Sequence, residues 1–172
     1  MAHPLAGPGA NGDDTIDPRL RAMRPRDRGP LAELGTHLFS PFGDYSTALP
    51  DWLRRPGVWC RVLDDGSGLP AGLALVTVMK GPDKNYQGYL LALGVVESMQ
   101  RQGWGRRLLE QAIQELHKRK KRYTLEWIRL TVAADNFAAI ELFESSGFRP
   151  APNEVEHYED GQRAISMRKP LD

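Results

Sequence analysis

The stretch GYLLALGVVESMQRQGWGRRLLEQAIQEL, residues 88–116, decides the fold that this chain is expected to adopt. Its apolar residues 89–96 predict a short buried strand, and the apolar residues between 108 and 116 recur at helical spacing. A turn with two glycines, Gly103 and Gly105, separates them. The sequence therefore predicts a strand, a glycine-containing turn and a helix in direct succession.

The glycine turn predicts a site for a phosphate-bearing ligand. A helix N-terminus has N–H groups without intrahelical partners and carries the positive end of the helix dipole, so it attracts anions. Glycine in such a turn lets backbone amides approach an anion because no Cβ stands in the way. Arg101, Arg106 and Arg107 flank the turn with charge of the matching sign.

The spacing of the glycines distinguishes this turn from two common phosphate loops. It lacks the Gly-Lys-Ser/Thr of the Walker pattern, and Leu108 stands where the dinucleotide pattern has its third glycine. The turn sequence QRQGWG, residues 100–105, instead fits the pattern Q/R-x-x-G-x-G/A. This pattern resembles the acetyl-CoA pyrophosphate loop of the GNAT superfamily of N-acetyltransferases.

A second motif, ADNFAAIELFESSGF, occupies residues 134–148. A capped amphipathic helix explains much of it, because Asp135 or Asn136 can cap the helix and Gly147 can end it. Its order N-x-x-A-I-x-L-[Y/F]-x-x-x-G-F also resembles the second GNAT motif, and it follows the first motif by one helix and one strand. With two motifs in register over residues 88–148, the chain is similar to the GNAT family, and most of all to the N-terminal alanine acetyltransferases of ribosomal proteins.

Several further strands are predicted outside the two motifs. Residues 58–63, 69–79 and 89–96 predict consecutive strands joined by tight turns, which form an antiparallel meander. Two more predicted elements are a strand at 125–132 and a final hairpin within 154–169. The resemblance implies the GNAT fold, an α/β (α+β) domain. Its central mixed, mostly antiparallel sheet of about six or seven strands is flanked by helices, and a splayed strand pair binds CoA.

The N-terminal third of the chain mixes regular and irregular segments. Leu20 and Met23 indicate a short first strand, and Asp27 can cap a helix over residues 29–39. Residues 40–57 are aromatic, prolyl and irregular. They are expected to form a surface connection with a few anchoring aromatic side chains, and a loop that lines a substrate site is the alternative.

Length, charge and cysteine content limit the class of protein. The chain has 172 residues, a formal net charge of +1 and a single cysteine, Cys60, which is expected to pack as a small hydrophobe. One domain over residues 15–172, a disordered lead over residues 1–14 and a cytoplasmic location without a membrane partner are predicted. The neutral charge balance argues against nucleic acid as a partner. The basic run 118–122 is expected to be a solvated helix end, with a nucleic-acid patch as the alternative.

The resemblance implies acetyl-CoA as the co-substrate, and no metal is expected. Leu93, Gly94 and Val95 would present backbone groups to the pantetheine arm and to the thioester oxygen, where an N–H group gives oxyanion-type stabilisation. The remaining ligand residues implied by the family follow along the chain: Gln100, Arg101, Gln102, Gly103, Trp104, Gly105 and Arg106 for the pyrophosphate, Asn136 for the pantetheine arm, and Phe143 against the thioester end.

Two positions depart from the acid and base of the family. Phe143 stands where many members have a tyrosine that protonates the departing thiolate, and Thr131 stands where the N-terminal alanine acetyltransferases often carry a glutamate. Glu97, directly after the strand, and Tyr158, in the last hairpin, are the candidates for proton transfer instead. Because a thiol has a pKa near ~8.5, the thiolate can also leave unprotonated, and positioning alone can support the reaction.

The implied reaction is direct transfer of the acetyl group from acetyl-CoA to an amine of a protein N-terminus, a lysine or a small molecule. An α-amino group has an ordinary pKa of about 7.7–8.0, whereas that of lysine is about 10.4, so the α-amino group needs a base less. The alternative function is a non-catalytic acyl-CoA-binding module, in which the absent tyrosine marks loss of chemistry. A homodimer is also compatible with the resemblance.

Overall fold

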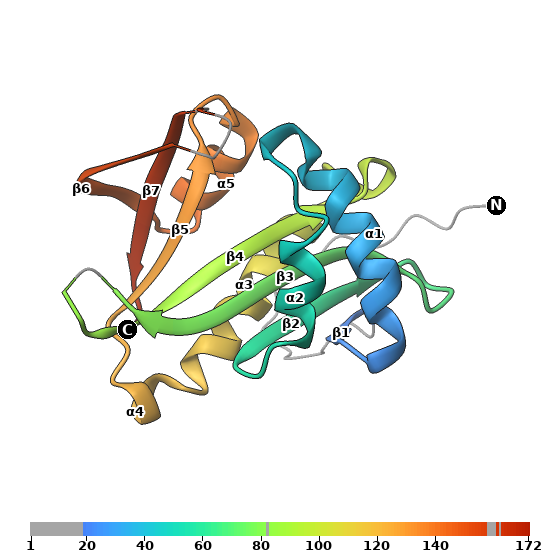
Figure 1. Ribbon diagram of the computed structural model, residues 1–172, viewed down its shortest axis with the longest axis horizontal. Helices are drawn as coiled ribbons and strands as arrows, with labels where there is room; N and C mark the ends of the chain where they lie inside the picture. Colours follow the sequence, from blue (N-terminus) through green and yellow to red (C-terminus); the bar gives the residue numbers. More distant parts are fainter. Residues whose placement is uncertain (1–18, 82, 158–160, 162) are drawn as a thin grey trace, which may run out of the picture.

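The fold is built on one sheet of seven strands. In chain order they are β1 (Leu20–Ala22), β2 (Val58–Asp64), β3 (Pro70–Lys80), β4 (Tyr86–Val95), β5 (Trp127–Ala133), β6 (Arg149–His157) and β7 (Arg163–Pro170). Their order in the sheet is β1-β2-β3-β4-β5-β7-β6 (Figure 1). Neighbouring strands are antiparallel except β4 and β5, which are parallel. The predicted fold class, including the antiparallel meander, is therefore confirmed.

The structure is a computed structural model that describes residues 19–81, 83–157, 161 and 163–172. The predicted disordered lead and Tyr158 lie outside the described residues. The predicted strands and the two motif helices are all present, with ends that differ by a few residues from the expected ones.

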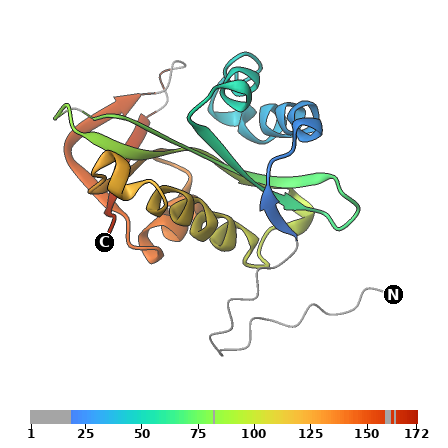
Figure 2. The ribbon, with the colours of Figure 1, turned by 90° about the horizontal axis from the view of Figure 1, so that it is seen from below.

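Helices cover both faces of the sheet (Figure 2). The elements are α1 (Arg28–Phe39), α2 (Ala48–Arg54), α3 (Trp104–His117), α4 (Lys120–Tyr123) and α5 (Phe137–Ser145), with 3-10 turns η1 (Pro25–Asp27), η2 (Ser40–Phe42) and η3 (Glu97–Met99). α1 and α2 lie on one face, and α3 and α5 lie on the other (Figures 1 and 2). No helix within the described ranges is long and apolar enough to cross a membrane.

The sheet separates two hydrophobic cores. Between the sheet and α3 and α5, the side chains of Leu108, Leu116 and Phe148 are fully buried. Between the sheet and α1 and α2, Leu31 and Leu49 are fully buried. Because both faces are covered, the interior strand β3 is buried over the seven consecutive residues 71–77, of which only Thr77 is polar, instead of alternating.

The segment 40–57, expected to be irregular, contains a helix. α2 forms there because Leu49 and Leu53, four residues apart, bury the same helical face against α1 and the sheet. Pro50 stands in the first turn of α2, where its missing N–H removes no intrahelical bond. The prediction of an irregular connection was therefore wrong for this part, since two apolar residues in a short prolyl segment are too weak a local pattern.

The parallel pair β4–β5 separates almost at once. The two strands are matched over only two residue pairs, Gly88 with Ile128 and Tyr89 with Arg129. A register shift in the ladder between β3 and β4 leaves Leu91 without an opposite residue on β3, which is a β-bulge. Because a bulge bends and twists its strand, β4 turns away from β5 beyond this point, as Figure 1 shows.

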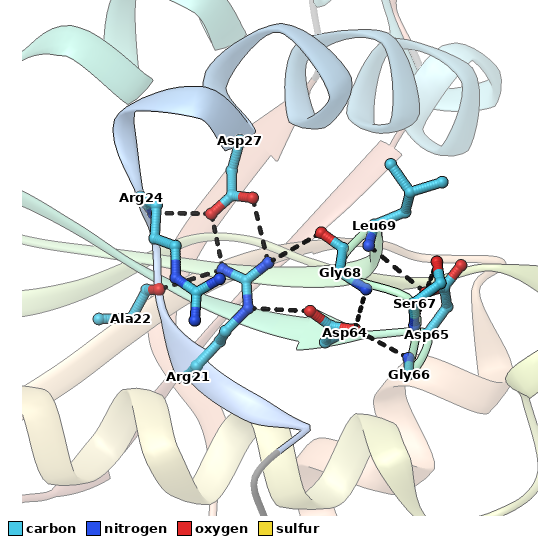
Figure 3. Close-up of polar contacts among 10 residues, drawn as sticks. All are labelled: Arg21, Ala22, Arg24, Asp27, Asp64, Asp65, Gly66, Ser67, Gly68 and Leu69. Atoms are coloured by element: carbon cyan, nitrogen blue, oxygen red, sulfur yellow. Dashed lines mark hydrogen bonds and ion pairs between the residues drawn. The ribbon is translucent and has the colours of Figure 1, made fainter.

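A buried ion-pair network fixes the N-terminal edge of the sheet (Figure 3). The Arg21 guanidinium donates to both carboxylate oxygens of Asp27, at 2.6 and 3.1 Å, and through Nε to Asp64 Oδ2 at 3.0 Å. Asp27 also accepts from the backbone N–H of Arg24, at 2.7 Å. Asp27 stands at the predicted N-cap position of α1, but its side chain makes no cap hydrogen bond. It instead links β1 to the start of α1.

This network shifts the pKa values of its members. The hydrogen bond from Arg21 is the main reason why the pKa of Asp27 lies below its usual value, and it outweighs burial, which acts in the opposite direction. Burial also acts against ionisation of Asp64, but the backbone N–H groups of Gly66 and Gly68, together with Arg21, lower its pKa. Ionised Asp27 therefore stabilises the folded state at pH values above the unfolded pKa, and this contribution is lost as the pH falls through the folded pKa.

We predict that Asp27→Asn lowers the free energy of unfolding by about 2–3 kcal/mol at pH 7, because Arg21 loses one of its two charged partners in a buried position. Urea denaturation at pH 7 and at pH 3 measures this loss. The difference from the wild type should shrink at the lower pH, since the wild-type carboxylate then begins to be protonated.

Asp51→Asn is the matched control for this change. Asp51 pairs with Arg55 at the surface, where the two side chains are 57% and 58% exposed, and such pairs contribute about 0–1 kcal/mol. An equally small effect of both substitutions would contradict a stabilising role of the Arg21–Asp27 pair.

Candidate functional site

A cavity of about 90 Å³ lies where β4 and β5 diverge. Four elements line it: residues 90–93 of β4, residues 130–133 of β5, the side chains of Asn136, Ala139 and Phe143 at α5, and the aromatic side chains of Phe39, Phe42 and Tyr45 at the end of α1 and the segment after it. The helices of both sheet faces therefore contribute to its walls. We call this space the strand gap.

The walls of the strand gap are mainly apolar. Among the described lining residues, polar side chains come from Thr131, Asn136 and Tyr45, and none carries a carboxylate or an imidazole. The backbone adds further polar groups, because the edges of β4 and β5 that face each other have parted and form no ladder there. The gap thus suits a narrow, largely uncharged chain that can hydrogen-bond to backbone groups.

Asn136 and Phe143 lie on the α5 side of the strand gap, and their expected contacts with the pantetheine arm and the thioester end stay predictions. Asn136 is the N-cap residue of α5, and its Oδ1 accepts from the N–H of Ala139 at 3.2 Å. Its Nδ2 has no acceptor among the described residues and can donate to a ligand. Phe143 is held edge-on against Phe148, with ring centroids 5.8 Å apart, so its ring forms a fixed apolar wall without a hydroxyl group.

The turn between β4 and α3 has the backbone of an anion site. Arg101 has φ +59° and Gly103 has φ +83°, and Gly103 is the N-cap residue of α3. Left-handed residues alternating with ordinary ones turn successive N–H groups toward one side, and the first turn of the helix adds N–H groups without intrahelical acceptors. A Cβ at Gly103 would meet no atom within 4 Å, so the space beside this turn is open.

Two glutamine side chains brace the same turn. Gln100 Nε2 donates to the carbonyl oxygen of Val95 at 2.9 Å, and Gln102 Nε2 donates to that of Ser98 at 3.2 Å. Both glutamines were predicted to contact the pyrophosphate. In the structure their side chains hold the turn against the end of β4 and the residues that follow it. Their contact with a bound phosphate stays a prediction.

Trp104, Gly105 and Arg106 connect the turn to the rest of the molecule. The Trp104 side chain is buried, so only its backbone N–H is available to an anion. A Cβ at Gly105 would lie 3.6 Å from Leu142 of α5, which leaves room for alanine there. The Arg106 guanidinium donates to Ser145 Oγ at 2.7 Å and so joins the start of α3 to the end of α5.

The last residues of β4 differ in their surroundings. Leu93 lines the strand gap. A Cβ at Gly94 would lie only 3.0 Å from Leu38 and 3.2 Å from the Phe39 ring, so the glycine lets α1 pack closely on β4. Val95 is buried, and its carbonyl oxygen already accepts from a glutamine side chain. Of the three, Leu93 is in the best position to meet a ligand.

Of the two candidates for proton transfer, Glu97 alone belongs to the described residues, and it does not line the strand gap. Glu97 is exposed and lines a separate cavity with His37, Leu38, Val96 and Gln100. A proton relay from Glu97 would therefore have to pass through water. Tyr158 lies outside the described residues, and its role stays a prediction.

Sequence reasoning did not assign the aromatic residues Phe39, Phe42 and Tyr45 to the site. Their rings lie at the strand gap, and Phe39 and Tyr45 also contact each other, with centroids 5.5 Å apart. The aromatic composition of the segment after α1 was the available signal. Phe42 and Tyr45 line a cavity, as the alternative of a site-lining loop requires, and their contact with a substrate stays a prediction.

Residues 30–148 match the family model described as Acetyltransferase (GNAT) family. The chain belongs to this family. The match covers more than half of the chain and includes the strand gap, the turn after β4 and α5.

Individual relatives fit this assignment. The chain is 42% identical over 85 residues to the [Ribosomal protein bS18]-alanine N-acetyltransferase of Escherichia coli (strain K12), over 48% of this chain and 55% of the relative. It is 32% identical over 85 residues to an N-alpha-acetyltransferase of Saccharolobus solfataricus, over 49% of each chain. The alignments thus span about half the length of these curated relatives.

Solved structures agree with the fold over a longer range. The crystal structure of the ribosomal-protein-S18-alanine N-acetyltransferase from Escherichia coli has a TM-score of 0.70 at 26% identity, covering 89% of this chain and 93% of that one. Arabidopsis thaliana NAA60 in complex with acetyl-CoA has a TM-score of 0.71 at 16% identity, covering 88% and 97%. At 16% identity the likeness concerns the fold alone.

We predict that Gly103→Glu lowers the affinity for CoA at least tenfold, because a carboxylate would occupy the open space beside residues 100–106, the proposed anion-binding turn. Isothermal titration calorimetry with CoA measures the affinity. Gly57→Glu is the matched control: Gly57 has φ +86°, a Cβ there meets no atom within 4 Å, and it lies before β2. Both substitutions add the same charge and the same backbone strain. An equal loss of affinity in the two variants would argue against the turn as the phosphate site.

Proposed function

We propose that the protein is an N-acetyltransferase that transfers the acetyl group of acetyl-CoA to the α-amine of a polypeptide N-terminus. The observation that supports it best is the strand gap, which is lined from both faces of the sheet and by β4, the strand that leads to the turn at the N-terminus of α3. A ligand with a phosphate end and a long, weakly polar arm fits such a combination. CoA has this shape, and solved GNAT-fold neighbours contain CoA or acetyl-CoA.

The proposed binding mode follows from the backbone. The turn of residues 100–106 would receive the pyrophosphate at the N-terminus of α3. The pantetheine arm would run between β4 and β5, where Asn136 Nδ2 and the free edge of β4 offer hydrogen bonds. The thioester would end near Phe143, whose fixed ring gives an apolar contact.

The acceptor would enter from the opposite side of the sheet. Phe39, Phe42 and Tyr45 line the strand gap from the α1 and α2 face, whereas Asn136 and Phe143 line it from the α5 face. Two substrates that arrive from opposite faces can meet in the gap without passing each other. Their reacting atoms are then held together, which is the main source of rate in a reaction of two bound molecules.

Direct attack is the simplest chemistry for this site. The neutral amine nitrogen would form a bond to the thioester carbon, a backbone N–H of β4 would stabilise the oxygen that becomes negative, and the C–S bond would then break. The amine loses one proton to solvent, and the departing CoA sulfur takes a proton from Tyr158, the proposed general acid, which regains one from solvent. A covalent route through Cys60 is disfavoured, because this thiol is buried in the α1 and α2 core and burial raises its pKa to about 12.

The lining of the strand gap favours an α-amine over a lysine side chain. No carboxylate or imidazole among its described residues can remove a proton from the acceptor. At pH 7.5 about a third of an α-amine is already neutral, compared with about 0.1% of a lysine, on their ordinary pKa values. The relatives named as N-alpha-acetyltransferases act on the same class of amine by their names.

We place this activity in the cytoplasm. The single cysteine is unpaired and buried in β2, so the fold needs no oxidising compartment.

Release of the CoA thiol tests the proposal. With acetyl-CoA at pH 7.5, we expect release in the presence of a peptide with a free N-terminal alanine. At least tenfold less release is expected with an N-terminally blocked lysine peptide or with spermidine. The Gly103→Glu variant should lose the activity, and the Gly57→Glu variant should keep it.

Each failure of this assay has its own meaning. Release with lysine or spermidine alone would contradict the α-amine acceptor while leaving acetyl transfer in place. Binding of acetyl-CoA without release for any acceptor would support the alternative, a non-catalytic acyl-CoA-binding module. That alternative is favoured by one observation, the absence of a hydroxyl at Phe143.

The pH dependence of kcat/KM tests the two candidates for proton transfer. We predict that Tyr158→Phe lowers kcat at least tenfold, as for the loss of a general acid, and that Glu97→Gln changes it less than twofold, because Glu97 lies in a separate cavity. Unchanged kcat/KM across pH in both variants would mean that positioning alone supports the reaction.

A further inference from the structure

A second cavity, of about 380 Å³, lies at the other end of β4. It is formed by the hairpin between β3 and β4 and by the segment from α4 to β5: Lys80, Asp83, Lys84, Asn85, Tyr86, Gln87, Tyr123, Thr124, Glu126 and Trp127. The ten residues of β4 span about 33 Å between this hairpin and the anion-binding turn. Figures 1 and 2 show α4 and the hairpin together at that remote end. The cavity is therefore separate from the strand gap.

Two tyrosines form an aromatic platform in this cavity. The rings of Tyr86 and Tyr123 have centroids 5.4 Å apart, and Tyr86 is 43% exposed although it is large and largely apolar. Cations flank both rings: Lys80 Nζ lies 5.8 Å from the centroid of Tyr86, and the Arg122 guanidinium lies 5.4 Å from that of Tyr123. Exposed aromatic rings with adjacent cations can stack on a planar ligand that also carries negative charge.

The basic run 118–122 divides into structural and unused cations. Lys118 and Arg119 both bind the carboxylate of Glu115. The central carbon of the Arg119 guanidinium also lies 3.5 Å from the centroid of the Trp59 ring. Lys121 and Arg122 are exposed and form no ion pair in the part of the chain that the structure describes. The expectation of a solvated helix end thus holds for the exposed Lys118, Lys121 and Arg122, whereas Arg119 and Lys120 are partly buried.

The hairpin adds two more cations across the cavity, Lys80 and Lys84, also without ion pairs to described carboxylates. Two acidic residues lie in the same cavity. Asp83 is engaged by the side chains of Asn85 and Gln87, at 3.2 and 3.1 Å, and Glu126 is exposed. Within the cavity Lys80 and Lys84 are matched in number by Asp83 and Glu126, so the excess of positive charge comes from α4, where Arg122 lies against the Tyr123 ring and Lys121 precedes it.

We propose that this basic-aromatic surface, made of Lys80, Lys84, Tyr86, Lys121, Arg122 and Tyr123, binds single-stranded RNA. Cations beside two tyrosine rings, inclined at 60° to each other, match the two elements of a single strand, a phosphate backbone and exposed bases. An acidic peptide or an anionic membrane would use the charges but not the tyrosine platform. The nearly neutral net charge of the whole chain does not oppose RNA binding at this surface. Salt screens charges over a Debye length of about 8–10 Å, so a bound phosphate interacts mainly with the cations close to it.

Fluorescence anisotropy with a labelled 12-nucleotide single-stranded RNA tests the proposal on the full chain. We expect saturable binding at 50 mM KCl, and a fall in affinity with rising salt. Lys80→Glu with Lys121→Glu should lower the affinity at least tenfold. Arg26→Glu with Arg28→Glu, which changes the net charge equally at exposed positions beside α1, should leave it within twofold.

Tyr86→Ala separates stacking from charge. Tyr86→Ala should lower the RNA affinity about tenfold. Tyr86→Trp should keep the wild-type affinity, because a tryptophan ring can also stack on a base. Acetyl transfer and the thermal denaturation midpoint report that each variant is folded, since the surface lies far from the strand gap.

Several outcomes would overturn the proposal. They are no RNA binding by the wild type at 50 mM KCl, equal losses in the two charge-reversal variants, and unchanged affinity in Tyr86→Ala. Competition experiments compare RNA with other polyanions at equal concentrations of negative charge. If polyglutamate or anionic vesicles displace the labelled RNA at a lower charge concentration than unlabelled RNA does, the partner belongs to a different class.

Discussion

The parting of β4 from β5 is the constraint on which the rest of this structure depends. After two residue pairs each strand keeps only its other neighbour, β3 or β7. Beyond that point, N–H and C=O groups in the middle of the sheet face a gap in place of a partner strand. Buried backbone polar groups are costly when unpaired, so such a gap is stable only if it is hydrated or holds a ligand. The closed end is held by buried groups, since the Arg129 guanidinium donates to the side chain of Gln87.

The two cores give the gap two different walls. α5 belongs to the core with α3 and presents Asn136 and Phe143, while the end of α1 belongs to the other core and presents Phe39. Each wall can therefore change without repacking the other. The wall on the α1 side is aromatic, and its position is fixed by the burial of Leu49 and Leu53.

The arginines show how burial decides the use of a charge. Arg21 binds two aspartates in a nearly enclosed position and joins β1, α1 and the turn after β2. Arg119 lies against Trp59 and Glu115, where it joins α3 to β2. These cations stabilise the fold and cannot serve a partner. Charges such as Lys121 and Arg122 lie one turn further along, where no described carboxylate neutralises them, and so they remain available for binding.

The sequence by itself determined the features that depend on near neighbours along the chain. The strand, the left-handed Gly103 and the start of α3 are adjacent in sequence, and Asn136 caps its own helix, so their local patterns were sufficient. Only the tertiary structure decided which distant residues meet. Tyr45 reaches the gap beside Phe143, Glu97 does not, and a hairpin lies beside α4. The physical reason is that these contacts depend on strand register and on the bulge in β4, which are set by pairing between segments far apart in the chain.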